Sequence, residues 1–157
     1  MEFDFIQPVD DEMCQFVKGL SPQQLGSKVV FHTKEDFPDL NKIKVAILGV
    51  LDNRGDKNQN TSVDLSSIRK ELYGLFPGNW DASIADLGDI VAGNSVQDTY
   101  YALKQLIASL LKKKIIPIVI GGSQDLTYAL YRAYDTLEQM VNLVSIDRKF
   151  DFGKESD

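Results

Sequence analysis

The stretch Ile115-Ile116-Pro117-Ile118-Val119-Ile120-Gly121-Gly122 is an unbroken apolar run that stops at two glycines. A short run rich in β-branched residues, without polar alternation, is typical of a strand covered on both faces in a parallel sheet. Pro117 cannot donate a ladder hydrogen bond, so we expect the strand to begin there. The carboxyl ends of such strands face the ligand crevice of an α/β protein. The candidate crevice residues therefore follow the run: Gly121, Gly122, Ser123, Gln124 and Asp125.

Length and composition indicate one globular domain. The chain has 157 residues, which is enough for one compact domain. Its content of 43% hydrophobic and 25% charged residues is ordinary for such a domain. The net charge of −6 argues against a nucleic-acid partner or an anionic membrane surface, because both need a cationic face.

The cysteine content and the amino terminus indicate a cytoplasmic protein. Cys14 is the single cysteine, so no intramolecular disulfide forms and a reducing compartment is expected. The acidic residues that precede it would raise the pKa of its thiol, so Cys14 is not expected to be reactive. The sequence shows no signal peptide, and no apolar run approaches the roughly 20 residues that span a bilayer.

Strand and helix patterns alternate along residues 41–157, which predicts a single α/β domain with a parallel sheet of at least four strands. Besides the opening run, strands are predicted over residues 42–50, 82–87 and 141–146. Helices are predicted over 63–76, 96–113 and 126–140, with Ser95 and Asp98 as a capping box for the second. Residues 1–40 are expected to be an irregular N-terminal segment, with a short helix over 9–20 and an edge strand over 29–31.

Three predicted strand ends carry polar side chains to one edge of the sheet. These side chains are Asp86 and Asp89, then Ser123, Gln124 and Asp125, then Asp147 and Asp151. Converging carboxylates suit a hard divalent cation such as Mg²⁺ or Mn²⁺. The alternative is that these aspartates cap helices and end turns, and from spacing alone this interpretation is preferred.

Four segments together resemble the arginase-family ureohydrolases, which include arginase, agmatinase and formimidoylglutamase. Residues 121–125 resemble the family's Gly-Gly-Asp-His-Ser motif, and residues 145–151 resemble its Asp-Ala-His-x-Asp motif. Ile68-Arg69 matches the Ile-Arg of the family's first helix, and Asp86-Leu87-Gly88-Asp89 matches a recurrent Asp-x-Gly-Asp. The resemblance covers about residues 43–153. It implies a three-layer α/β/α sandwich with a mainly parallel sheet, incomplete in this chain, and a binuclear manganese centre in active members.

The family's metal ligands are only partly present when the motifs are compared residue by residue. The resemblance places Gln124 and Lys149 where the family has histidines, while Asp147 and Asp151 keep ligand chemistry. The family's third motif, Ser-x-Asp-x-Asp, has no counterpart here, and we expect this chain to hold about the amino-terminal half of a ureohydrolase and to expose a sheet edge. These four positions are therefore predicted to be a vestigial metal site. No catalytic residue and no cofactor are expected, with manganese as the cofactor if the site is retained.

Lys149 has two possible roles in such a site. Its ammonium group, which cannot bind a metal while it is protonated, would lie between Asp147 and Asp151 and replace the positive charge of the metal. The alternative is that Lys149 points to solvent. The sequence leaves both possibilities open.

The leading functional prediction is a ureohydrolase-like domain that lacks hydrolytic activity as it stands and acts through binding or assembly. The main alternative is a formimidoylglutamase-like or agmatinase-like manganese-dependent hydrolase of linear amidines in its full-length form. That form needs ligands from elsewhere, and His32, the only histidine, is expected to be structural. A weaker alternative is a phosphate or nucleotide site, formed by the amides of residues 121–123 and the helix that follows. The predicted partners are further copies of the chain, as in the family's trimers and hexamers, or the missing carboxyl-terminal half.

Overall fold

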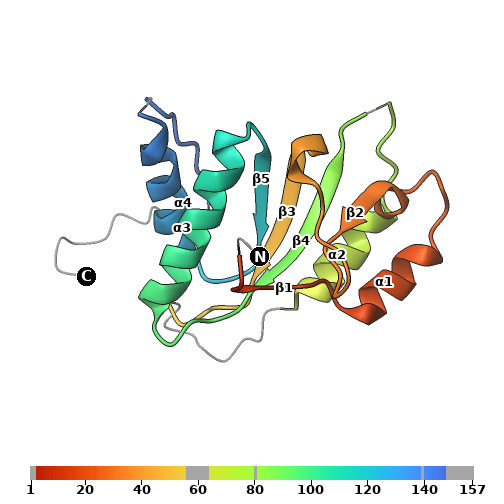
Figure 1. Cartoon of the computed structure of the whole chain (residues 1–157), viewed down its shortest axis with the longest axis horizontal. Helices are drawn as coiled ribbons and strands as arrows, with labels where there is room; N and C mark the ends of the chain where they lie inside the picture. The colour runs from red at the N-terminus through yellow and green to blue at the C-terminus, as the bar shows by residue number, and fades with distance from the viewer. Residues whose placement is uncertain (1–2, 56–63, 80, 139, 148–157) are drawn as a thin grey trace.

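The computed structural model describes residues 3–55, 64–79, 81–138 and 140–147, and Figure 1 shows their arrangement. The helices are α1 Asp11–Lys18, α2 Leu65–Gly74, α3 Val96–Lys112 and α4 Leu126–Tyr134. The strands are β1 Ile6–Gln7, β2 Val29–Phe31, β3 Val45–Val50, β4 Ile84–Ile90 and β5 Ile116–Ile120. Short 3-10 helices cover Leu25–Lys28, Leu40–Lys42 and Asp135–Leu137.

The strands form one mainly parallel sheet with β4 and β3 at its centre. β3 pairs in parallel with β4 on one side and with β5 on the other. Along its other edge, β4 pairs with two strands. Its first residues, from Ile84, pair in parallel with β2, and its last residues, up to Ile90, pair antiparallel with β1. The edge strand over residues 29–31 and the parallel sheet are thus confirmed, and β1 makes the sheet mixed.

Helices cover the two faces of the sheet, so the predicted three-layer architecture is confirmed (Figure 1). α3 and α4 pack on one face, where Leu103, Leu106 and Ala129 share a buried cluster with Leu48 and Leu87. α1 and α2 lie on the other face, where buried residues form a second cluster: Met13, Tyr73, Val45, Ile47 and Ile84. The predicted capping box of α3 is also present, because Ser95 Oγ accepts from the Asp98 amide and Asp98 Oδ2 accepts from the Ser95 amide.

β4 is longer than predicted, and this changes the position of two candidate site residues. The strand continues to Ile90 instead of ending at residue 87, because both β3 and β1 pair with its last residues. Asp86 and Asp89 therefore lie within a strand and not in a loop at its end. Gly88, between them, has φ +87°, and a Cβ there would lie 1.9 Å from the backbone oxygen of Gln7. Only glycine tolerates this backbone conformation and this close approach.

The prediction that β5 is covered on both faces is wrong. Among the described strands β5 pairs only with β3 and lies at the edge of the sheet, and Ile116 and Ile118 are 62% and 40% exposed. The strand begins at Ile116, whose amide donates to the Lys44 carbonyl of the segment before β3. Backbone groups alternate along a strand, so the nitrogen of Pro117 faces the open edge, where no donor is needed.

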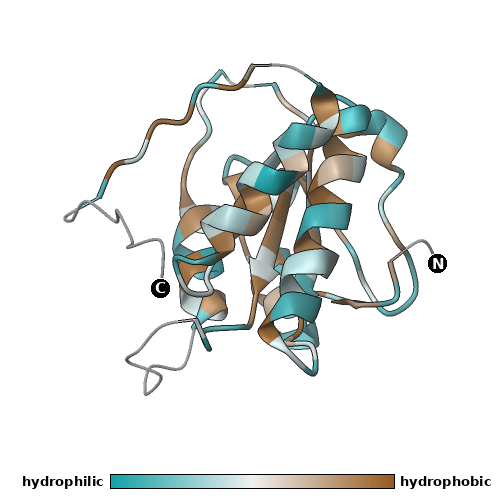
Figure 2. Ribbon diagram, turned by 90° about the vertical axis from the view of Figure 1, so that its left-hand side faces the viewer, coloured by the Kyte–Doolittle hydropathy of each residue, from teal (hydrophilic) through white to brown (hydrophobic). Residues whose placement is uncertain are grey.

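Residues 141–146 do not form the predicted strand, and α4 ends earlier than predicted, at Tyr134. No described strand pairs with this segment, and the side chains of Leu143, Val144 and Ile146 are exposed. Figure 2 shows the segment as an extended trace outside the helices. An apolar pattern alone does not make a strand, since a strand also needs a partner for its backbone.

No helix in the described part of the chain is long and apolar enough to cross a bilayer.

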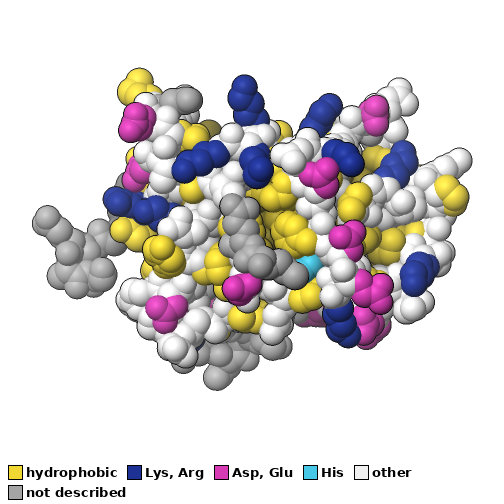
Figure 3. All heavy atoms as spheres, in the orientation of Figure 1, with side chains coloured by type: hydrophobic (Ala, Val, Ile, Leu, Met, Phe, Trp, Pro, Cys, Tyr) yellow, Lys and Arg dark blue, Asp and Glu magenta, His cyan; other side chains and the backbone are white. Residues whose placement is uncertain are grey.

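On the face drawn in Figure 3, Lys and Arg side chains are interspersed with Asp and Glu.

Candidate functional site

The turn after β5 is built by two glycines. Gly121 and Gly122 have φ values of +78° and +74°, in the left-handed region that other residues rarely adopt. A Cβ on Gly122 would lie 2.1 Å from Leu126 Cδ1, so the turn packs directly on the first residue of α4. The Ser123 amide donates to the Asp52 carbonyl at 3.1 Å and is therefore not free to bind a phosphate. This weakens the phosphate-site alternative.

Asp52, whose carboxylate is buried, lies beside this turn and connects the loop after β3 to the start of α3. Arg54 donates to it through Nε at 3.0 Å and Nη2 at 2.8 Å, and the Thr99 hydroxyl of α3 donates at 2.6 Å. Arg54 also donates to the carbonyls of Gly93 and Asn94, which follow β4. The hydrogen bonds from Arg54 lower the pKa of Asp52 to about 2, and the hydrogen bond from Thr99 contributes. This cluster fixes the loop after β3 against the start of α3.

Asp125 lies under the same loop. Its Oδ2 accepts a hydrogen bond from the hydroxyl of Tyr100 in α3, and burial together with this carboxylate raises the pKa of Tyr100 to about 12. A Cβ on Gly55 would lie 2.1 Å from the Asp125 carboxyl carbon, so the loop backbone passes directly over this carboxylate. Ser123 and Asp125 are thus brought together with the loop after β3, and their role in a crevice stays a prediction.

Asp86 and Asp89 do not join this edge, which corrects the predicted constellation. Arg69 of α2 binds Asp86 at 2.7 Å and Asp89 at 2.8 Å, and Tyr73 donates to Asp86 as well. Burial lowers the pKa of Arg69, but the two carboxylates more than offset this and hold it above its usual value. Burial also raises the pKa of Asp89, although Arg69 opposes the shift. The four side chains form an ion cluster that fastens α2 to β4.

Two of the four positions that the sequence predicts to be a vestigial metal site lie side by side. Gln124 Nε2 donates a hydrogen bond to Asp147 Oδ2, so the two predicted motifs do meet in space. Lys149 and Asp151 lie outside the described residues, and the predicted role of Lys149 stays a prediction. Within the described residues, no three His, Cys, Asp or Glu side chains are placed to hold a metal ion.

His32 and Cys14 have structural surroundings. The His32 ring is buried, lies 2.9 Å through Nδ1 from the Leu87 carbonyl and stacks edge-on against Phe37. Burial, together with Asp10 and Asp11, raises the pKa of the Cys14 thiol, as expected from the sequence. Neither residue faces the turn after β5 in these contacts.

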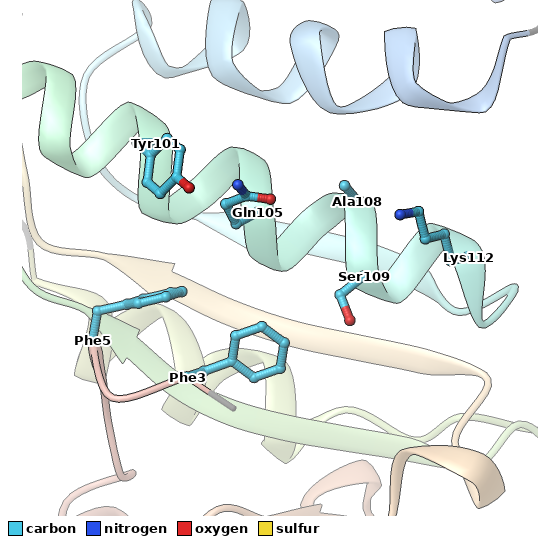
Figure 4. A pocket seen from close by; sticks show the side chains of 7 residues that line it. All are labelled: Phe3, Phe5, Tyr101, Gln105, Ala108, Ser109 and Lys112. Atoms are coloured by element: carbon cyan, nitrogen blue, oxygen red, sulfur yellow. The ribbon is translucent and has the colours of Figure 1, made fainter. Parts of the chain in front are cut away.

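A pocket of about 440 Å³ lies elsewhere, between the N-terminal segment and α3 (Figure 4). Phe3 and Phe5 form one wall, and Tyr101, Gln105 and Lys112 of α3 lie along the other. It contains none of the residues predicted to form a site.

The sequence from residue 43 onward matches a known family. Residues 43–157 match the sequence model of the Arginase family. The chain belongs to the arginase family. A formimidoylglutamase of Halobacterium salinarum is 32% identical in an alignment of 92 residues that covers 55% of this chain and 30% of that relative. A formimidoylglutamase of Macrococcus caseolyticus is 29% identical in an alignment of 117 residues that covers 70% of this chain and 37% of that relative.

The fold of the chain is also found in this family. The crystal structure of a hypothetical agmatinase from Burkholderia thailandensis matches with a TM-score of 0.52 at 19% identity. The match covers 64% of this chain and 35% of that chain. The chain thus spans about a third of the length of these arginase-family relatives.

The cluster of Asp52, Arg54 and Thr99 was not predicted from the sequence. Asp52 follows the strand predicted over residues 42–50, in a position where aspartate is common for turn reasons alone. The available signal was its position, since it comes two residues after the buried strand β3, whose carboxyl end faces the crevice in α/β folds. Its arginine and threonine partners are 2 and 47 residues away, and only the folded chain brings the threonine near.

Asp52 should make stability depend on acidic pH. Its folded pKa of about 2 lies below the usual value of about 3.9, so its contribution is complete above pH ~4 and is lost as pH falls toward 2. In urea unfolding at a series of pH values, Asp52→Asn should reduce the loss of stability between pH ~4 and ~2. The exposed Asp81→Asn serves as control. An Asp52→Asn chain with the same pH slope as the parent would contradict this role.

Proposed function

We propose that this chain is an arginase-family domain that does not hydrolyse amidines as it stands and that acts through binding or assembly. The observation that carries the proposal is the hydrogen bond from Gln124 to Asp147. An amide nitrogen has no lone pair to offer a metal, whereas an imidazole nitrogen does, so Gln124 could offer only its carbonyl oxygen. The resemblance places Gln124 at a histidine ligand of the family. Gln124 therefore does not replace the nitrogen ligand of the family's manganese site.

Lys149 supports the same proposal. By resemblance it stands at the second histidine, and a protonated ammonium is not a metal ligand. His32 does not replace either imidazole, because its ring is buried against Leu87 and Phe37. We also infer a cytoplasmic location from the single cysteine.

Metal content and activity test this proposal on the whole chain. We expect little manganese by mass spectrometry, the same melting temperature in Mn²⁺ and in chelator, and no product from formimidoylglutamate, agmatine or arginine. The Macrococcus caseolyticus formimidoylglutamase is the positive control for the formimidoylglutamate assay. Stoichiometric manganese together with a raised melting temperature would refute the proposal.

A second candidate is a manganese-dependent formimidoylglutamase-like hydrolase in a longer form of the protein. It is favoured by the two relatives named formimidoylglutamase, which are about three times as long as the regions they share with this chain. Product formation from formimidoylglutamate, but not from agmatine or arginine, would support it.

A further inference from the structure

The pocket between the N-terminal segment and α3 has walls that belong to the core. Phe3 on one wall and Ala108 on the other are buried members of the larger core cluster. Phe5 packs against this cluster and contacts Phe3 edge-on, with ring centroids 5.8 Å apart. Core packing therefore holds both walls in place. The volume of about 440 Å³ is in the range of small-molecule sites.

Aromatic rings gather at one end of this pocket. Tyr101 lies in the second turn of α3, and Figure 4 shows Phe5 across the pocket from it. Phe3 lies next to Phe5 on the same wall. Rings attract one another in edge-to-face and offset-stacked arrangements, so three rings from two segments suit an aromatic group between them.

Polar groups line the pocket toward the end of α3. Gln105, Ser109 and Lys112 follow at helical spacing, so they lie on the same side of the helix as the tyrosine. Within the described residues, no hydrogen bond or ion pair engages these three side chains. Figure 4 shows the Lys112 ammonium directed back along the helix, toward Ala108. The described lining thus offers one cation and two neutral polar groups, and no carboxylate.

We propose that this pocket binds a small aromatic carboxylate, with its ring at Phe3, Phe5 and Tyr101 and its carboxylate at Lys112. A single ammonium is a point charge, which matches a carboxylate better than a dianion. Tyr101 and Lys112 lie about three turns apart on α3, so a chain must join the ring to the carboxylate. Gln105 and Ser109, between them, offer hydrogen bonds to the carboxylate or to a polar group on that chain.

The pocket is separate from the positions where the family has its metal ligands. Residues 43–157 match the Arginase family model, and Phe3 and Phe5 precede this range. One wall thus comes from a part of the chain that the family model does not cover. The inference goes beyond the proposed function, and its test depends on neither manganese nor hydrolysis.

Titration of the full chain with phenylpropionate, followed in two-dimensional amide NMR spectra, tests this site. The largest shifts should occur in residues 3–5 and 101–112, which line the pocket. The neutral isostere phenylpropionamide should bind about two- to fivefold more weakly, because it lacks the charge that attracts Lys112. Cyclohexylpropionate should also bind more weakly, because its ring cannot make aromatic contacts.

Two exposed lining residues provide variants that leave the core intact. Lys112→Gln should weaken phenylpropionate binding about two- to fivefold and remove its preference over the amide. Tyr101→Ala should weaken the binding of both ligands about two- to tenfold. Lys113→Gln and Tyr131→Ala are the matched controls, because both residues are exposed and neither lines the pocket. The same spectra show whether each variant is folded.

Saturable shifts in the pocket, with this order of affinities, would support the site. No concentration-dependent shift up to the solubility of phenylpropionate would overturn it, and so would shifts centred outside the pocket. Equal affinities for the carboxylate and the amide would also overturn it. The same holds if a control variant weakens binding as much as the lining variant with which it is matched.

Discussion

Replacing Arg69 with methionine should lower the free energy of unfolding by about 3–5 kcal/mol, because the buried carboxylates that Arg69 binds would lose their positively charged partner. Arg69 is 4% exposed, and it binds Asp86, which has no exposed surface, and Asp89. Methionine fills a similar volume but offers no positive charge. The two carboxylates would then lie close together in the core, desolvated and mutually repelling. Urea unfolding followed by circular dichroism measures the loss.

The neighbouring residue provides the matched control for this prediction. Lys70 also lies on α2 and also pairs with an acid, Glu12, but both side chains are exposed. Surface ion pairs contribute about 0–1 kcal/mol, so Lys70→Met should change stability by no more than that. Equal losses in the two variants would mean that the Arg69 cluster does not fasten α2 to the sheet.

Replacing Gly88 with alanine should cost at least about 2 kcal/mol, for two reasons that add. The backbone has φ +87°, which is strained for any residue with a Cβ. The new Cβ would also lie 1.9 Å from the backbone oxygen of Gln7, so β1 must move away from β4. We expect faster hydrogen exchange of the amides in β1 in addition to the lower stability.

Gly78 is the control that distinguishes the strain of a positive φ from the clash with the Gln7 backbone. It also has a positive φ, +61°, but a Cβ there would meet nothing within 4 Å. Gly78→Ala should therefore cost only the conformational strain of about 1 kcal/mol. If Gly88→Ala cost no more than Gly78→Ala, close packing of β1 on β4 would not explain the glycine.

Prediction from sequence was most accurate where a local pattern and the fold agree. The capping residues Ser95 and Asp98 predicted the start of α3, because a cap is a local interaction between residues three apart. Residues 141–146 show the opposite case. Their apolar pattern predicted a strand, but strand formation depends on a neighbouring strand that no local pattern reveals.

In the candidate site, too, predictions from local sequence differ from what depends on tertiary contacts. The glycine turn and Asp125 follow β5 directly, as the sequence predicted, and their role in a crevice stays a prediction. Asp86 and Asp89 were placed there wrongly. Their spacing after a strand pattern suggested a loop, whereas pairing with β3 and β1 extends the strand and Arg69 binds both side chains.

The sequence by itself determined the fold class, the family resemblance and the identity of Gln124 and Lys149 at the family's histidine positions, because these depend only on residue type and order. Only the tertiary structure decided which charges are paired, which carboxylates are buried and that β5 is an edge strand among the described residues. Asp52 and Thr99 are 47 residues apart, and Arg69 and Asp86 are 17 apart. Such contacts depend on how the layers pack, and burial then determines the strength of each interaction.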